Sequence, residues 1–226
     1  MDKQQALQRI DQEAALFCAD SDAIWDCPET AYQEETAARI LCDRLEAEGF
    51  SVTRGLAGIA TAFLGRWGEG RPVIGFLGEY DALSGLSQEA GSCEKRPLPD
   101  IPAGHGCGHN LLGAGALAAA SAYKAYLEEN RLPGTVLYFG CPAEEGGSGK
   151  AFLARDHVFD ELDAAITWHP GDSTQVFGGS SLANCQVYYR FHGTSAHAAA
   201  CPHLGRSALD AVELMNVGVQ FLREHM

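Results

Sequence analysis

The sequence predicts an α/β domain with a largely parallel, buried sheet, followed by a shorter α+β segment. Apolar stretches of strand length alternate with segments of helical period, the pattern of βαβ units, and the central strand candidates are continuous apolar runs, as in strands covered on both faces. The pattern changes near Gly178–Ser181, after which one strand and one helix remain. We therefore expect a three-layer α/β domain over 1–178 and an incomplete α+β domain over 179–226.

Two helices are expected before the first strand. The first lies in the polar segment that begins MDKQQALQRIDQE. The second begins at Thr30, because Thr30-Ala-Tyr-Gln33 has the form of a capping box, and it ends at Gly49. An apolar stripe at helical spacing supports this second helix: Ala38, Leu41 and Leu45.

The rest of the chain divides at turn and loop signals. Strands are predicted over 59–64 and 73–77, joined across the turn at 68–70, and the aperiodic stretch 84–102 is interpreted as a long loop of the kind that is often functional. The later elements of the first domain are a helix, a strand, a short helix and a strand: 110–129, 135–139, 149–155 and 164–168. The second domain would contain a strand and a helix: 185–191 and 205–225.

Composition excludes several classes of function. The chain has 226 residues, of which 46% are hydrophobic and 20% charged, so a disordered protein is not expected. A net charge of −14 argues against nucleic acid and anionic membranes as partners. The apolar run 111–123 is too short for a membrane span of about 20 residues. The N-terminus has no signal-peptide pattern, and eight scattered cysteines are typical of thiols in a reducing cytoplasm.

Chemically capable side chains gather at the ends of the predicted strands. Glu79 and Asp81 follow the strand 73–77, Glu144 and Glu145 follow 135–139, and His169 follows 164–168. Ligands of open α/β sheets bind beyond the carboxyl ends of the strands. The segment GHGCGHN at 104–110 leads directly into a helix. We therefore expect all four clusters to converge on one edge of the sheet.

Cys107 and His109 are spaced so that both can reach one metal ion or two adjacent ions. Thiolate and imidazole are ligands that zinc and similar ions prefer, and the positive end of the helix dipole would help to ionise the thiol. The alternative is a glycine-rich turn with a buried thiol and a capping imidazole. This motif alone leaves both interpretations open.

The pair Glu144–Glu145 favours the metal. Adjacent carboxylates point in different directions, so one can bind metal while the other takes a proton from the attacking water and delivers it to a leaving amine. The alternative is an acidic surface turn, although the apolar strand upstream makes it less suitable. Asp81 could orient a metal ligand or simply cap a turn.

Two other functions use fewer of these residues. A cysteine protease would take Cys107 as nucleophile and His105 or His109 as base, and it would leave both glutamates and His169 unused. A structural zinc site would need no glutamate pair. A hydrolytic metal site is therefore the preferred interpretation.

The motifs GHGCGHNLLGAG, PAEEGGSGK, TWHP and SAHAAACPHLGRSALDAVELMNVGVQFLREHM together resemble the amidohydrolase branch of the aminoacylase and di-metal carboxypeptidase family. The resemblance implies two divalent ions, manganese or zinc. It implies that Cys107 bridges them, that His109 and His169 bind one ion and Glu145 the other, and that Glu144 is the general base. Glu79 stands where many relatives have a ligand histidine.

The resemblance also implies a fold and a substrate. The second domain would be a ferredoxin-like lid, in which His197 matches the histidine that reaches into a partner subunit's site and stabilises the oxyanion. An N-acyl amino acid would be hydrolysed. Asn110 stands where other members of the branch have aspartate, which favours p-aminobenzoyl-glutamate as the leading candidate.

One feature departs from the family. In relatives the catalytic domain resumes after the lid and supplies a final histidine ligand, whereas this sequence ends at Met226, inside the expected lid. None of the remaining histidines matches that ligand: His157, His192, His203 and His225. We therefore expect the chain alone to be poorly active and to bind its second ion weakly. The alternative is a truncated, non-catalytic subunit that binds only metal or a partner. For the enzyme, a homodimer or hetero-oligomer through the lid is expected.

Overall fold

The computed structural model describes residues 1–225 and divides the chain into two compact units, 1–174 and 175–226. The domain boundary predicted at 178 lies near this division. The assignment of the second unit as a lid remains a prediction.

The first unit is built around a mixed five-stranded sheet of order β1-β2-β6-β3-β7. β3 is parallel to both β6 and β7, whereas β1 and β6 are antiparallel to β2. The α/β class is confirmed, but the largely parallel sheet is wrong for two of the four pairings. The strands β1 and β2 are joined by too short a connection for the crossover that parallel pairing requires. The strands have these bounds: β1 Ser51–Arg54, β2 Phe63–Glu69, β3 Val73–Gly78, β6 Gly134–Gly140 and β7 Ala164–Ile166.

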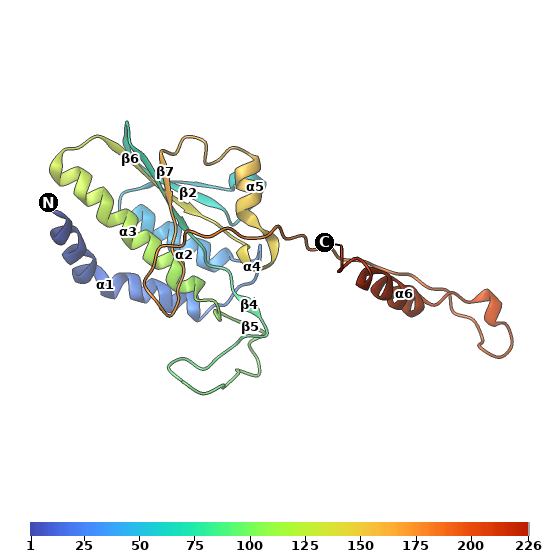
Figure 1. Cartoon of the computed structure of the whole chain (residues 1–226). Helices are drawn as coiled ribbons and strands as arrows, with labels where there is room; N and C mark the ends of the chain where they lie inside the picture. The colour runs from blue at the N-terminus through green and yellow to red at the C-terminus, as the bar shows by residue number, and fades with distance from the viewer. Residues whose placement is uncertain (226) are drawn as a thin grey trace. The chain divides into compact units, whose positions relative to one another are not determined.

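Helices cover both faces of this sheet, which confirms the three layers (Figure 1). Val136 and Tyr138 of β6 pack in one core with α1, α2 and α3, while Leu137 and Phe139 pack in a second core with Leu153 of α5. Successive residues of a strand point to opposite faces, so one strand supplies both cores. The helices have these bounds: α1 Lys3–Trp25, α2 Glu35–Ala47, α3 His109–Asn130, α4 Glu144–Gly147 and α5 Gly149–Arg155.

Two local predictions are wrong. The strand predicted over 59–64 begins only at Phe63, and a 3-10 turn at Leu56–Gly58 precedes it. β2 and β3 are joined across the turn at 68–70 as predicted, and β6 lies between them in the sheet. Thr30 does not cap α2. The Glu29 carboxylate instead accepts the backbone N–H groups of Thr36 and Ala37, which satisfies two donors of the first turn.

A long loop follows β3, as predicted. Its ends pair in a short antiparallel ladder of β4 (Leu83–Ser84) with β5 (Ala103–Gly104), and no helix or strand lies between them in the described chain. β5 leads directly into the GHGCGHN segment and then into α3. The loop is therefore anchored beside the segment that carries the candidate metal ligands.

The second unit contains α6 (Ala208–Gln220), which Ser207 caps by accepting the N–H of Asp210. Within the described residues the strand predicted over 185–191 does not form, and an isolated bridge joins Thr194 to Arg206. A strand needs a partner for its backbone groups, and none pairs with this segment here. Leu214 and Phe221 are 74% and 73% exposed. Over residues 1–225, no helix is long and apolar enough to cross a membrane.

Candidate metal centre

The predicted convergence of the four clusters is confirmed. β6, β3 and β7 are adjacent and parallel, so their carboxyl ends meet at one edge of the sheet. Glu79 and Asp81 follow β3, Glu144 opens α4 beyond β6, and His169 follows β7. The GHGCGHN segment, which leads into α3 at His109, brings Cys107 and His109 to the same edge.

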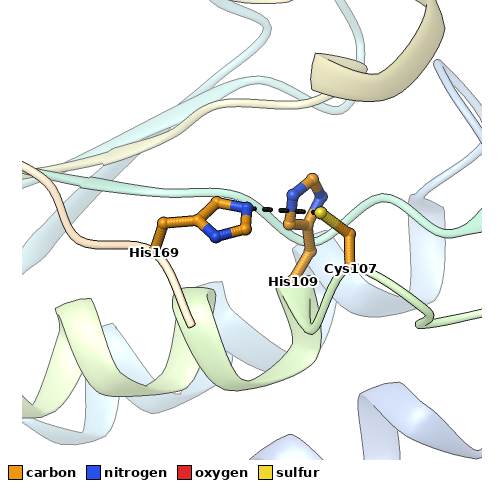
Figure 2. Close-up of side chains that lie close together, drawn as sticks. All are labelled: Cys107, His109 and His169. Carbon is orange, nitrogen blue, oxygen red and sulfur yellow. Dashed lines mark hydrogen bonds between the residues drawn. The ribbon is translucent and has the colours of Figure 1, made fainter. Parts of the chain in front are cut away.

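Cys107, His109 and His169 form one potential metal-binding group. One ligand atom from each lies within 4.8 Å of the others, and Cys107 Sγ is 3.2 Å from His169 Nε2 (Figure 2). Gly108 between the first two has φ of +78°, a left-handed conformation in which a side chain would be strained, and an added Cβ would lie 3.0 Å from Pro170. This glycine lets the thiol and the imidazole face the His169 segment.

Glu79, His109 and Glu144 form a second group, so His109 belongs to both. His109 Nε2 lies 3.1 Å from Glu79 Oε2 and 3.9 Å from Glu144 Oε2. Glu145 Oε1 is also 3.9 Å from this nitrogen. The geometry thus places every carboxylate that the sequence singled out around one buried imidazole, including Glu79.

Asp81 orients this imidazole. Its Oδ1 lies 2.9 Å from His109 Nδ1, and its Oδ2 accepts the backbone N–H of Glu145 at 2.8 Å. A carboxylate can only accept, so Nδ1 carries a proton. Burial lowers the pKa of this ring, but Asp81, Glu79 and Glu145 outweigh it and raise the pKa. Once the ring is deprotonated, as a metal ligand must be, Nε2 presents its lone pair to the cluster. Of the two roles that the sequence left open for Asp81, the structure supports the orientation of a ligand.

The residues fit a cation. Three buried atoms of this cluster have no hydrogen-bond partner among the described residues: Glu79 Oε2, His109 Nε2 and Glu145 Oε1. All three are lone-pair atoms in the arrangement set by Asp81, and a buried acceptor left unpaired costs about 1 to 3 kcal/mol. Lys150 pairs with the other oxygen of Glu79, but one ammonium does not balance four carboxylates. Thiolate, imidazole and carboxylate are also the donor set that zinc and manganese take.

The pKa of the Cys107 thiol is raised in the fold, opposite to the effect expected of the helix dipole. Burial is the largest influence and raises its pKa to about 12, and a hydrogen bond that the thiol donates to Glu145 and the negative charges of the glutamates act in the same direction. These effects oppose the helix dipole that was expected to ionise the thiol. A protonated thiol is a poor nucleophile, which argues against the cysteine-protease interpretation. Burial, followed by the charge of Glu79, raises the pKa of Glu144 above its ordinary value, which suits a proton acceptor.

His105 lies apart from both groups. Its ring is 4% exposed, and its Nε2 lies 3.1 Å from the carbonyl oxygen of Ile24, to which it donates. Burial lowers its pKa to about 4, so the ring is neutral at physiological pH. This histidine is therefore a poor candidate for a base acting on Cys107.

Two residues that position the Glu144–Glu145 turn could not be identified from the sequence. Glu34 is fully buried, and its Oε1 accepts the N–H of Ala143 at 2.8 Å while its Oε2 accepts the hydroxyl of Thr61. Tyr32 donates its hydroxyl to the carbonyl of Gly147 at 2.7 Å. Ala143 and Gly147 lie at the two ends of the α4 turn. The Tyr32–Glu34 segment therefore holds both ends of the turn that carries Glu144 and Glu145, a contact between distant segments that no local pattern reveals.

Residues 75–218 match peptidase family M20/M25/M40. The chain belongs to this family. Over 217 residues it is 54% identical to one subunit of the p-aminobenzoyl-glutamate hydrolase of Escherichia coli K12, covering 96% of this chain and 45% of that protein. It is 34% identical to the mouse (Mus musculus) Xaa-Arg dipeptidase, covering 99% of this chain and 51% of the other. The chain thus spans about half the length of these relatives.

Solved structures share the M20 fold. An aminobenzoyl-glutamate utilization protein from Klebsiella pneumoniae superposes with a TM-score of 0.53 at 17% identity, over 72% of this chain and 46% of the other. A dinuclear metal-binding M20 peptidase from Bacillus subtilis gives 0.54 at 22% identity, over 68% and 42%. These likenesses agree with the family assignment and with the expected three-layer α/β fold.

His197 of this M20 chain lies in the second unit and is exposed. Its Nδ1 accepts the backbone N–H groups of Ala199 and Ala200 at 3.2 and 3.1 Å, which fixes the ring against its own turn. Its role at an oxyanion remains a prediction.

Proposed function

We propose that the protein hydrolyses the amide bond of an N-acyl amino acid at a divalent metal centre, with p-aminobenzoyl-glutamate as the leading substrate. The observation that carries this proposal is the convergence of two ligand groups on His109, with three buried lone-pair atoms unsatisfied and Glu144 beside them. The name of the 54% identical relative supports the choice of substrate.

Two divalent ions, zinc or manganese, are proposed for this centre. Cys107, His109 and His169 would hold one ion; Glu145, with Cys107 shared, would hold the other. A bound divalent ion supplies a Lewis acid that polarises a carbonyl group and makes water acidic. Glu79, which lies 3.1 Å from His109 Nε2, is a further candidate ligand.

Glu144 is proposed as the general base. Its side chain is 45% exposed, whereas that of Glu145 is 20% exposed, so Glu144 is the more accessible of the pair to water and substrate. It would take the proton of the attacking water and pass it to the leaving nitrogen. Asp81 and Glu34 would hold the imidazole and the glutamate turn while the proton moves.

The names of the E. coli hydrolase subunit and the mouse dipeptidase point to substrates that share two chemical features. A p-aminobenzoyl-glutamate molecule and a dipeptide ending in arginine both contain an amide bond to an amino acid. Both also carry an amino group on the acyl side of that bond. We therefore propose an N-acyl amino acid whose acyl part bears an amine.

The second candidate function is that of a metal-binding subunit without activity of its own. The name of the 54% identical E. coli relative describes one subunit of a hydrolase, and the chain is 33% identical to another subunit named for the same hydrolase of that organism, over 178 residues. A homodimer or a hetero-oligomer through 179–226 is therefore part of the proposal. The eight scattered cysteines favour a cytoplasmic location.

The test measures metal content and amide hydrolysis together. The 226-residue chain is compared with a chimera that appends the remaining sequence of the 54% identical E. coli relative, each loaded with zinc or manganese and supplied with a panel of acyl amino acids. Release of p-aminobenzoate by the chimera, but not by its Glu144→Gln variant, supports the hydrolase. Metal binding without release of any amino acid by either protein supports the non-catalytic subunit. Absence of stoichiometric metal in both would contradict the proposed centre.

A further inference from the structure

The two carboxylate oxygens of Glu79 have different surroundings in the candidate centre. Oε1 accepts a hydrogen bond from the ammonium group of Lys150, which is the only hydrogen-bond partner of this carboxylate among the described residues. Oε2 lies 3.1 Å from His109 Nε2 and has no hydrogen-bond partner there. A cation of the chain therefore holds one oxygen, while the other faces the imidazole that both candidate ligand groups share.

The backbone of Glu79 is held by close packing that does not involve Lys150. At Gly113 of α3, an added Cβ would lie 2.8 Å from the carbonyl oxygen of Glu79, so the helix and this residue are in close contact. The next side chain, Tyr80, is fully buried and donates its hydroxyl to the carbonyl of Thr61 at 2.7 Å. These contacts fix where the Glu79 side chain begins. The direction of its carboxylate depends on Lys150.

The position of Lys150 is unfavourable for the helix that carries it. Lys150 is the second residue of α5, whose first turn contains no acidic residue, and the positive end of a helix dipole disfavours a cation. The Lys150 and Glu79 side chains are 29% and 9% exposed, so both charges lose hydration when they pair. Replacement of a buried ion pair by apolar residues is often neutral or stabilising. Stability of the fold alone therefore gives no reason for this pair.

We propose that Lys150 is a positioning residue of the metal centre, which holds Oε1 of Glu79 so that Oε2 faces a bound ion. Partners of this kind orient the ligands of metal sites, and their loss typically weakens metal binding 10- to 100-fold. Lys150 thus does for the carboxylate of Glu79 what Asp81 does for the imidazole of His109.

The positive charge of Lys150 acts in the opposite direction. An ammonium group close to a divalent ion repels it, so removal of the charge by itself would tighten metal binding. Because the Glu79 carboxylate contacts the ammonium with one oxygen and faces the ion with the other, its negative charge offsets this repulsion. The loss of orientation then outweighs the loss of charge, and the sign of the change in affinity distinguishes the two effects.

This inference rests on the proposed metal centre, in which Glu79 is a candidate ligand. It goes further by giving a role to a cation that belongs to neither ligand group. Zinc alone is the probe, so the experiment needs no substrate and no turnover.

The test is a double-mutant cycle on zinc binding, measured by calorimetry on the 226-residue chain. Lys150→Met keeps the apolar stem and removes the ammonium, and it should weaken zinc binding about 10- to 100-fold. Glu79→Gln should weaken the same binding event. In the Glu79→Gln background, Lys150→Met should no longer weaken zinc binding, because a residue that acts through Glu79 has no carboxylate left to orient.

Three further variants separate orientation from charge and from folding. Lys150→Arg keeps a cation that can donate to Glu79, and it should restore most of the affinity that Lys150→Met loses. Lys124→Met removes an ammonium that pairs with Glu128 on α3, and as the matched control it should bind zinc like the wild type. Thermal unfolding without metal verifies that each variant is folded. If Lys150→Met is not, Lys150→Gln, which is neutral and shorter, replaces it with the same expected direction.

The outcomes distinguish failure of this inference from failure of the proposed centre. Zinc affinity that is unchanged or higher in folded Lys150→Met overturns the role of Lys150 and leaves the centre standing. A weakening that persists in the Glu79→Gln background also overturns it, because Lys150 would then act by another route. Absence of zinc binding by the wild type overturns both. The expected cycle without amide hydrolysis by the chimera makes Lys150 a positioning residue in a metal-binding subunit that is not the proposed hydrolase.

Discussion

Asp81 and His109 face each other in the buried floor of the candidate centre, with Oδ1 and Nδ1 2.9 Å apart. The second oxygen of Asp81 accepts the backbone N–H of Glu145. One carboxylate therefore fixes the orientation of the imidazole that both ligand groups share and the position of a glutamate from a different strand end. A metal centre assembled from several loops depends on such ties, because each loop end would otherwise move independently.

Replacement of Asp81 by Asn should weaken metal binding about 10- to 100-fold, the usual effect of removing an outer partner of a ligand histidine. The amide can accept from only one of its two present donors, so either the ring or the Glu145 backbone loses its partner. Competition with a chelator measures the zinc affinity of the 226-residue chain. Asp43→Asn, in an exposed pair with Arg39, is the control and should bind zinc like the wild type. Equal affinities for all three proteins would contradict the role of Asp81.

Cys107→Ser should lower zinc affinity more than tenfold, since a hydroxyl does not ionise readily to give the anionic ligand that a thiol can supply. The effect should also appear in stability, because a metal at 100 times its dissociation constant stabilises the folded state by about 2.7 kcal/mol. Thermal unfolding with and without zinc should therefore show a smaller shift in this variant. Cys18→Ser, at an exposed position of α1, should keep the full shift. A Cys107→Ser protein with the wild-type shift would exclude the thiol as a ligand.

Glu34 should make stability fall as the pH rises. Burial is the largest influence on its pKa and raises it above the ordinary value of 4.5, although hydrogen bonds from Tyr32, Ala143 and Thr61 partly oppose this. The folded state thus holds the proton more tightly than the unfolded state. Stability from the protonated group is fully present below 4.5 and is lost as the pH passes through the folded-state pKa.

The Glu34→Gln side chain does not titrate. As the pH rises above 4.5, the unfolding free energy of the wild type should therefore fall relative to that of the variant. Urea unfolding across this range measures it. Glu34→Ala, by contrast, leaves the N–H of Ala143 and the hydroxyl of Thr61 without an acceptor, which costs about 1 to 3 kcal/mol each where they stay buried. Glu34→Ala should also lower the affinity for zinc, whereas Glu34→Gln should keep the wild-type affinity. Zinc affinity that is unchanged in the Ala variant would mean that Glu34 supports the fold alone.

The helices and strands could be predicted from the sequence wherever the hydrophobic pattern is local and repeated. The helix expected over 110–129 is α3, the short helix over 149–155 is α5, and the apolar run 135–139 lies in β6. The convergence of the strand-end residues followed from parallel pairing of β6, β3 and β7 alone. These features depend on hydrophobic period and on one rule of topology, both of which can be read from a single chain.

The remaining features depend on contacts between distant segments. The insertion of β6 between β2 and β3 is a choice of partner that no hydrophobic pattern specifies. The clamp of Glu34 on Ala143 joins residues 109 positions apart. The helix dipole beside Cys107 is visible in the sequence, whereas the burial and the three glutamates that raise the pKa of its thiol arise only in the fold.

Glu144→Gln should separate catalysis from metal binding. The amide keeps the size of the side chain but cannot take a proton, so hydrolysis should fall about 10²- to 10⁴-fold, the usual contribution of a general base. Metal content should change little if Glu145, rather than Glu144, is the ligand of the pair. Rates of p-aminobenzoyl-glutamate hydrolysis are measured on whichever of the 226-residue chain and the chimera is active, and metal content is measured on both.

Glu145→Gln is the matched control and should show the reverse pattern, with loss of metal and a rate partly recovered by excess metal. A Glu144→Gln protein that loses an ion would make Glu144 a ligand, as its grouping with Glu79 and His109 allows, and the base would have to be sought elsewhere.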